Sequence, residues 1–203
     1  LDGLNSLTSI GGRLVLKNMA KLRSLDALSN LKGVVGGGIH LEGLPALESL
    51  PPLQISGLGQ DNEDSLAVSD CAALGDLSGF GSLQGRLPGY VKISRCSSLR
   101  SLRGLEGLTS FGGIEVDECP RLESLAAFRG LAGDVVLKLR LSKLPRLQSL
   151  HGLQGINGTG WSRACACSGC SGLLPTHITI VDCPQLQSIA ALSLVRGGIG
   201  RIE

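Results

Sequence analysis

Apolar residues recur along the chain in an order that repeats at roughly 25-residue intervals. The pattern that the copies share has leucines at every third position, then a glycine pair, an alternating triplet of the form I-x-V, and the segment x-x-C-P-x-L-x-S. The copy from Leu102 to Ser124, for example, reads LRGLEGLTSFGGIEVDECPRLES. Self-similarity of this kind is typical of a solenoid, in which each copy forms one coil and buries its apolar residues against its neighbours.

The alternating triplet predicts a short β-strand in each copy. In the fifth copy Ile114 and Val116 are expected to point inward and Glu115 outward, because successive side chains of a strand lie on opposite faces. Strands are expected to begin near Leu14, Ile39, Leu66, Val91, Ile114, Leu139 and Ile178, with a degraded copy near Ile202. Copies that repeat in one phase predict parallel pairing of these strands.

The remainder of each copy is expected to return the chain to the next strand. Leucines three residues apart, such as Leu102, Leu105 and Leu108, favour a 3₁₀-like or extended return over a long helix. The glycine pair, Gly112 and Gly113 in the same copy, allows a sharp turn into the strand. Prolines that cannot donate to a continuing ladder are expected to close the strands at Pro45, Pro120, Pro145 and Pro184.

Together these features predict a mainly β fold, a right-handed leucine-rich-repeat-type β-solenoid of about eight coils with one main parallel sheet. Residues 1–203 are interpreted as a single solenoid and as a fragment of a longer protein. The expected coils are 1–24, 25–49, 50–76, 77–101, 102–124, 125–149, 150–188 with an insertion at 156–172, and a partial coil at 189–203.

The pattern I-x-V-x-x-C-P-x-L-x-S-L, combined with L-x-x-L-x-x-I-G-G, resembles the receptor L-domain branch of leucine-rich repeats. That branch includes the ligand-binding L domains of insulin- and epidermal-growth-factor-type receptors and related fungal and bacterial surface glycoproteins. The resemblance covers nearly all of residues 1–203 apart from the insertion. It implies an extracellular or cell-surface location, although the asparagine that often precedes the proline in this family is replaced in this chain.

Composition agrees with a core of repeated aliphatic layers. Hydrophobic residues make up 42% of the chain, and only five residues are aromatic. The formal net charge is +2 and no block of basic residues stands out, which argues against a nucleic-acid partner. No apolar run approaches 18 residues, so no membrane-spanning segment is expected in this region.

One position of the repeat, directly before the proline or the residue that replaces it, is expected to form a buried ladder. It is occupied by Met19, Leu44, Cys71, Cys96, Cys119, Leu144 and Cys183. Side chains at equivalent positions of parallel strands point the same way, a poor disposition for the dihedral angle of a disulfide. The ladder cysteines are therefore expected to be free thiols that act as small hydrophobic residues.

The insertion contains most of the residues that suggest an extracellular setting. Asn157 begins an N-x-T sequon, and Trp161 is a candidate anchor for a partner. Cys165, Cys167 and Cys170 are candidates for a disulfide in a secreted protein, with the third pairing with Cys183 or remaining free. Zinc ligation by the loop cysteines, completed by His151, His177 or Cys183, is the weaker alternative, and no metal is predicted.

The outward strand positions are expected to form two rows across the sheet. The first row is Val15, His40, Ala67, Lys92, Glu115, Arg140 and Thr179, and the second is Lys17, Glu42, Ser69, Ser94, Asp117, Ser142 and Val181. Charges alternate along Lys92, Glu115 and Arg140, which are therefore expected to pair along the row. Such a row is either a solvated face or a partner-binding pattern, and these three residues are predicted partner contacts.

No residues suggest catalysis, so no enzyme and no cofactor are predicted. The predicted function is a non-catalytic extracellular recognition or structural scaffold module, such as a surface receptor, an adhesion protein, or a component of a cell wall or surface filament. Its expected partner is another protein or further chain of the same assembly, with Asn157 as a candidate glycan site. The alternatives are an intracellular leucine-rich repeat adaptor or sensor and, third, a β-helix glycan-active enzyme.

Overall fold

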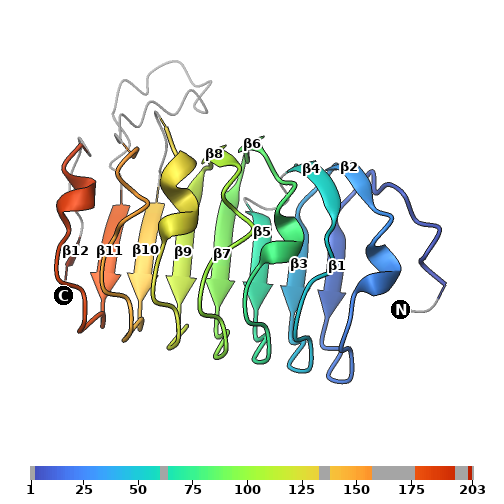
Figure 1. Ribbon diagram of the computed structural model, residues 1–203, viewed down its shortest axis with the longest axis horizontal. Coiled ribbons are helices and arrows are strands. Elements are labelled where there is room, and N and C mark those ends of the chain that lie inside the picture. Colours follow the sequence, from blue (N-terminus) through green and yellow to red (C-terminus); the bar gives the residue numbers. More distant parts are fainter. Residues whose placement is uncertain (1–2, 60–63, 133–137, 157–176, 195–200, 203) are drawn as a thin grey trace, which may run out of the picture.

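The structure is a computed structural model that describes residues 3–59, 64–132, 138–156, 177–194 and 201–202. The chain forms an elongated stack in which one long sheet runs from end to end (Figure 1). Eight strands lie in that sheet in the order β1-β3-β5-β7-β9-β10-β11-β12, and every neighbouring pair is parallel. The protein is therefore mainly β, with a parallel β-solenoid architecture, as the repeated triplet predicts.

The main sheet is built from the predicted triplets. Its strands are β1 (Leu14–Lys17), β3 (Ile39–Glu42), β5 (Asp64–Ser69), β7 (Tyr90–Ser94), β9 (Gly113–Asp117), β10 (Lys138–Ser142), β11 (His177–Val181) and β12 (Arg201–Ile202). In β9, Ile114 and Val116 are buried whereas Glu115 is half-buried on the other face, which confirms the predicted alternation. Alternation of this kind gives each strand one face for the core and one for solvent.

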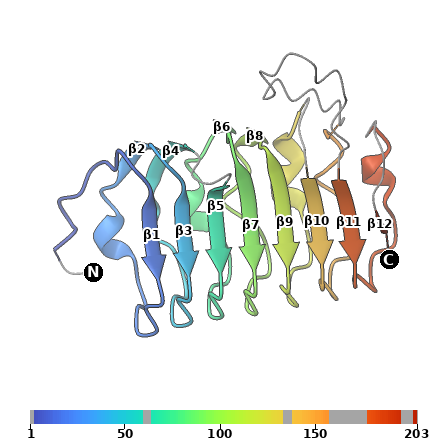
Figure 2. The same ribbon diagram turned by 180° about the vertical axis from the view of Figure 1, so that it is seen from behind.

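The return segments combine 3₁₀-helices with two small parallel sheets. The 3₁₀-helices are η1 (Asp26–Leu28), η2 (Ser78–Phe80), η3 (Ala126–Gly130) and η4 (Ala190–Leu192). The small sheets pair β2 (Lys32–Val35) with β4 (Gln54–Leu58), and β6 (Gly85–Arg86) with β8 (Leu108–Ser110). The 3₁₀-helices lie on the side of the stack away from the main sheet, which Figure 2 shows from its strand side.

Two kinds of return segment alternate along the chain. In one kind a 3₁₀-helix follows a serine or aspartate whose side chain accepts a backbone N–H two residues on, as Ser124 Oγ does from Ala126 at 3.0 Å. In the other kind a glycine with positive φ takes the place of the helix, at Gly3, Gly104 and Gly152, and Pro51-Pro52 occupies the equivalent stretch between η1 and η2. We call these helical returns and turn returns.

Two of the turn returns, at Gly104 and Gly152, require glycine because the chain there passes close to the preceding helical return. A Cβ on Gly104 would lie 2.0 Å from the Leu77 carbonyl oxygen, and φ at this residue is +107°. Gly152 has the same environment, with φ of +112° and a Cβ position 2.2 Å from the Leu125 carbonyl oxygen. Both the dihedral angle and the close approach exclude a side chain.

A single hydrophobic core runs through the stack. It is lined mainly by leucines, and it is completed by three phenylalanines, Phe80, Phe111 and Phe128, all fully buried. Phe111 and Phe128 meet edge to face with ring centroids 5.2 Å apart. Within the described residues, no helix has the length and apolarity needed to cross a bilayer.

Candidate functional site

The outward face of the main sheet carries the two predicted rows of side chains. Strand register aligns Lys92 with Glu115 and Glu115 with Arg140, and it aligns Lys17 with Glu42 in the second row. The full rows continue as predicted from Val15 to Thr179 and from Lys17 to Val181. The three residues predicted as partner contacts therefore lie side by side on β7, β9 and β10.

The ion pairs on this face differ from the prediction for the first row. Lys92 Nζ lies 2.9 Å from Asp64 Oδ1, and Lys138 Nζ lies 2.5 Å from Glu115 Oε1. Both pairs run diagonally between the first row and a third row. The third row lies one outward-facing position nearer the strand starts and consists of Asp64, Tyr90, Gly113 and Lys138. In the second row, Lys17 and Glu42 do pair along the row, at 2.9 Å.

The Lys92–Asp64 pair lies beside the packed ring of Tyr90. Register places Gly113 between Tyr90 and Lys138, and a Cβ on Gly113 would lie 2.4 Å from the Tyr90 ring. The ring therefore rests on the glycine. Lys92 Nζ lies 5.6 Å from the centroid of the same ring, within the range of a cation–π contact. Tyr90 and Asp64 together hold the Lys92 ammonium toward the strand starts.

Beside this cluster the sheet face has a hollow of about 200 Å³. Its lining comprises Lys92, Ile93, Ser94, Arg95, Glu115, Asp117 and Arg140. Three cations and two carboxylates thus surround a space that could receive one or two side chains of another molecule. Arg140 is exposed and forms no ion pair with any residue in the described part of the chain.

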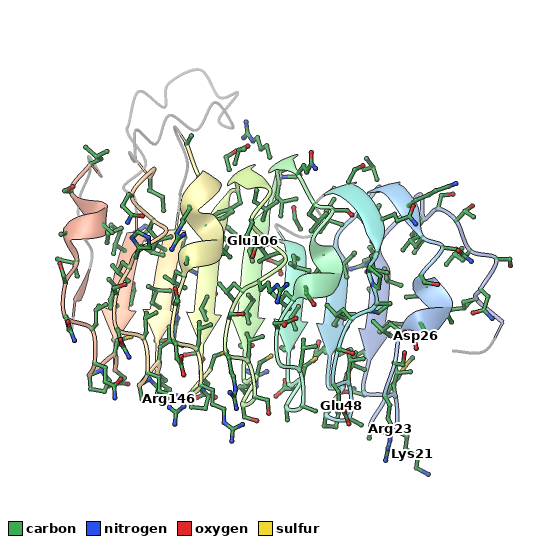
Figure 3. All side chains as sticks on the ribbon, in the orientation of Figure 1. Lys21, Arg23, Asp26, Glu48, Glu106 and Arg146 are labelled. Carbon is green, nitrogen blue, oxygen red and sulfur yellow. The ribbon has the colours of Figure 1, made fainter. Side chains whose placement is uncertain are left out.

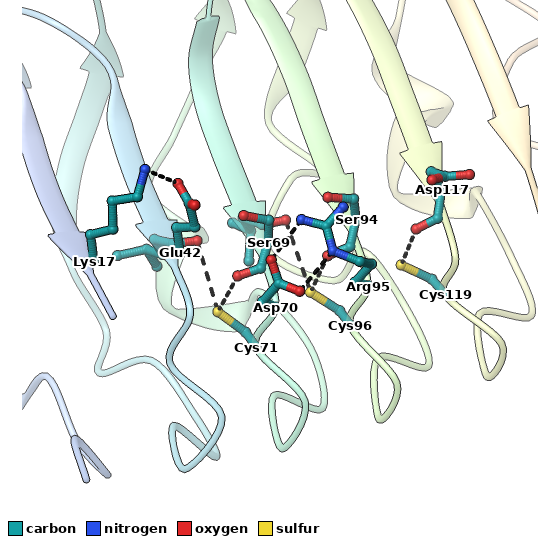
Figure 4. Close-up of polar contacts among 12 residues, drawn as sticks. Lys17, Glu42, Ser69, Asp70, Cys71, Ser94, Arg95, Cys96, Asp117 and Cys119 are labelled. Atoms are coloured by element: carbon teal, nitrogen blue, oxygen red, sulfur yellow. Dashed lines mark hydrogen bonds and ion pairs between the residues drawn. The ribbon is translucent and has the colours of Figure 1, made fainter. Parts of the chain in front are cut away.

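Several charged side chains in and beside the hollow are held in place by hydrogen bonds within the protein. Asp70 accepts hydrogen bonds from Nε and Nη2 of Arg95 at 2.7 and 2.6 Å (Figure 4). This bidentate contact lowers the pKa of the Asp70 carboxyl and raises that of the Arg95 guanidinium. Asp117 accepts a hydrogen bond from the hydroxyl of Ser142 on the adjacent strand.

A row of left-handed residues at the strand ends escaped the sequence analysis. The residue directly after each of the strands β1, β3, β5, β7, β9, β10 and β11 has φ between 52° and 64°, and the row reads Asn18, Gly43, Asp70, Arg95, Glu118, Lys143 and Asp182. From Asp70 onward the charges alternate, and Glu118 pairs with Lys143 as Asp70 pairs with Arg95. Pairing with Glu118 raises the pKa of Lys143. The alternating charges can be seen in the sequence at this position of the repeat, but the positive φ of these residues cannot.

The predicted ladder is buried in the middle of the stack and exposed at its first position. Leu44, Cys71, Cys96, Cys119 and Leu144 are fully buried, and Cys183 is half-buried. Met19, however, is 38% exposed, so its prediction as a buried residue was wrong. Burial of a ladder position requires a neighbour on both sides, and Met19 belongs to β1's coil at the edge of the described stack.

The ladder cysteines are free thiols in a uniform geometry. In each of Cys71, Cys96 and Cys119 the sulfur lies 3.4 Å from the carbonyl oxygen two residues earlier (Figure 4). A hydrogen bond with Cys119 raises the pKa of Cys96 to about 12, and the same contact lowers the pKa of Cys119. Hydrogen bonding to Cys96, followed by burial, raises the pKa of Cys71.

Cys183, the remaining ladder cysteine, also has a free thiol, and burial raises its pKa. The other residues predicted from the insertion are Asn157, Trp161, Cys165, Cys167 and Cys170, and they lie outside the described residues. The predicted contacts that the structure brings together are therefore those of the sheet face, around Lys92, Glu115 and Arg140.

Comparison with known proteins does not identify a family for this chain. No protein-family model, no curated protein and no solved structure matches the chain.

Proposed function

We propose that this chain is a non-catalytic recognition or structural scaffold module that binds a protein partner on the outward face of its main sheet. The observation that carries the proposal is the hollow between Lys92, Glu115 and Arg140, where charges of both signs surround a space of about 200 Å³. Mixed charge of this kind selects a partner with the complementary arrangement and disfavours others.

Pre-organisation supports the same proposal. The Lys92 ammonium is held by Asp64 and Tyr90, and Arg95 is held by Asp70. Side chains that are already ordered lose less conformational entropy on binding, so more of the contact energy appears as affinity. A sheet whose strands are fixed in register from β1 to β12 supplies the rigid support that such a surface needs.

We also propose a handedness, a coil number and a repeat type for the stack. We interpret the stack as a right-handed solenoid of about eight coils of leucine-rich-repeat type, supported by the repeat spacing and by the eight strands of the main sheet. The resemblance to receptor L domains, the Asn157 sequon and the cysteines of the insertion favour an extracellular or cell-surface setting.

The compartment can be tested through the thiols. Mass spectrometry of the native protein should find the insertion cysteines oxidised and Cys71, Cys96 and Cys119 free. Seven reduced cysteines would instead favour an intracellular adaptor or sensor, because disulfides are rare in reducing compartments.

The binding proposal can be tested by charge reversal. The purified chain is used to capture partners from the surface or secreted fraction of its source cells, and any saturably bound protein is quantified. Arg140→Glu should abolish that binding, whereas Arg23→Glu, which makes the same charge change at an exposed residue of a loop, should not (Figure 3). Equal binding by wild type and Arg140→Glu would refute the sheet face as the binding surface.

A further inference from the structure

The side of the solenoid that carries the 3₁₀-helices has a groove of about 460 Å³. It lies between the turn return at Gly104 and the helical return at η3, and Figure 3 labels Glu106 on this side. The polar lining residues are Ser101, Arg103, Glu106, Ser124 and Arg129. The groove thus arises where a turn return is followed by a helical return.

A second groove, of about 310 Å³, arises in the same way between Gly152 and η4. Its lining includes residues at equivalent positions of the repeat, namely Ser149, His151, Gln154, Ser188 and Ala190. The backbone contact is also repeated: Glu106 Oε2 accepts the Gly104 N–H at 2.7 Å, and Gln154 Oε1 accepts the Gly152 N–H at 2.6 Å. The two grooves share their construction, but only the first is lined by two arginines.

The two arginines of the first groove have no anionic partner within the described part of the chain. Within the described residues, neither Arg103 nor Arg129 forms an ion pair, although both line the groove and both are exposed. The hydroxyl oxygens of Ser101 and Ser124 accept backbone N–H groups of Arg103 and Ala126, which leaves each hydroxyl proton able to donate. The groove therefore offers guanidinium and hydroxyl donors together with one carboxylate.

We propose that this groove binds an acidic peptide segment of a protein partner, with a carboxylate side chain held by Arg103 and Arg129. A guanidinium pairs with a carboxylate through two parallel hydrogen bonds, and the volume lies within the range of ordinary ligand sites. Glu106 favours an acidic peptide over a sulfated or phosphorylated polymer. It can accept backbone N–H groups of a peptide, whereas it repels the closely spaced charges of a sulfated or phosphorylated polymer.

This surface is separate from the sheet face of the proposed function. Arg140→Glu, the variant that tests the sheet face, should leave the groove and its ligand binding unchanged. Failure of either proposal is therefore distinguishable from failure of the other.

The test uses a fluorescein-labelled hexaglutamate peptide and fluorescence anisotropy with the whole chain. Wild type should bind the peptide saturably, and Arg103→Gln with Arg129→Gln should weaken binding at least tenfold. The matched control is Lys21→Gln with Arg23→Gln, which removes the same charge from two exposed residues of a distant loop (Figure 3) and should leave the affinity within twofold of wild type. Circular dichroism should show an unchanged fold for both double variants, because all four side chains are exposed.

Three results would overturn the proposal. The first is a wild-type protein that shows no saturable binding of hexaglutamate. The second is an equal loss of affinity in the control variant, which would indicate general electrostatic attraction. The third is tighter binding of a heparin-derived oligosaccharide or of inorganic phosphate than of hexaglutamate, which would assign the groove to a different ligand.

Discussion

The two sides of this solenoid follow different rules. On the sheet side the strands keep one register apart from a shift at the start of β5, and the left-handed residue after the strands recurs from Asn18 to Asp182. On the return side, by contrast, helical returns and turn returns alternate, and the two grooves lie where the turn returns at Gly104 and Gly152 are followed by helical returns. Backbone hydrogen bonding fixes the distance between neighbouring strands of a sheet. A return segment has a looser requirement, to bury a leucine at every third position, and it can meet this requirement with either kind of return.

The largest expected effect is on the return side, at a glycine of a turn return. Gly104→Ala should reduce the free energy of unfolding by about 3 kcal/mol, because the new methyl group combines a left-handed backbone with a clash against the Leu77 carbonyl. Gly75→Ala is the control, since a Cβ there meets no atom within 4 Å, and it should change stability by less than about 1 kcal/mol. Urea denaturation measures both. Equal losses of stability in the two variants would mean that the close approach to the Leu77 carbonyl does not determine where glycine and a turn return occur.

The next effect concerns the buried ladder. Cys96→Ala should cost about 1.5 kcal/mol, because it removes a fully buried sulfur from a closed site. Met19→Ala changes the equivalent position at the exposed edge and should cost less than about 0.5 kcal/mol. Thiol alkylation gives a second readout, with Cys96 and Cys119 protected until the protein unfolds and Cys183 reacting earlier. Rapid alkylation of Cys119 in the folded protein would contradict its burial.

A smaller effect is expected at the strand ends. Arg95→Gln should cost at most about 1 kcal/mol, since the Asp70–Arg95 pair is largely exposed. The folded-state pKa of Asp70 is lowered, so the contribution of the pair is present above the unfolded pKa, about 4, and is lost as the pH falls through the lowered value. The stability difference between wild type and variant should therefore persist at pH 6 and disappear in strong acid. A difference that grew on acidification would refute the assignment.

The smallest effect on stability is expected on the sheet face itself. Arg140→Glu should change the free energy of unfolding by less than about 0.5 kcal/mol, because Arg140 is exposed and has no ion pair within the described part of the chain. Thermal unfolding of wild type and variant measures this. A large loss of stability would show that Arg140 serves the fold instead of a partner.

The sequence predicted the sheet side well and the return side only in outline. Alternating triplets specify which strand residues point inward, so the strands and both rows could be predicted, including the neighbours Lys92, Glu115 and Arg140. The partners of these charges could not be predicted, because the position of the Lys92 ammonium depends on its contacts with the Tyr90 ring and with Asp64. Such a contact depends on side-chain direction, which spacing alone does not give.

The alternation of the returns was missed because all copies align on the same leucines. The difference lies in the residue between two of them, which is glycine at 104 and 152 and alanine at 27, 127 and 191. Gly79 shows why this signal is incomplete, since it lies within η2 and has no positive φ. The burial error at Met19 has a different origin: the repeat gives each ladder position the same environment, whereas the end of a stack lacks one neighbour.

The central claim, that the sheet face is the binding surface, is tested most directly by lysine reactivity in the complex. Acetylation of the free protein and of the complex with its captured partner, followed by mass spectrometry, reports the accessibility of each lysine. We predict that Lys92 and Lys138 lose reactivity in the complex while Lys21 on the distant loop keeps it. Unchanged reactivity of Lys92 and Lys138, with protection of Lys21 instead, would contradict the account.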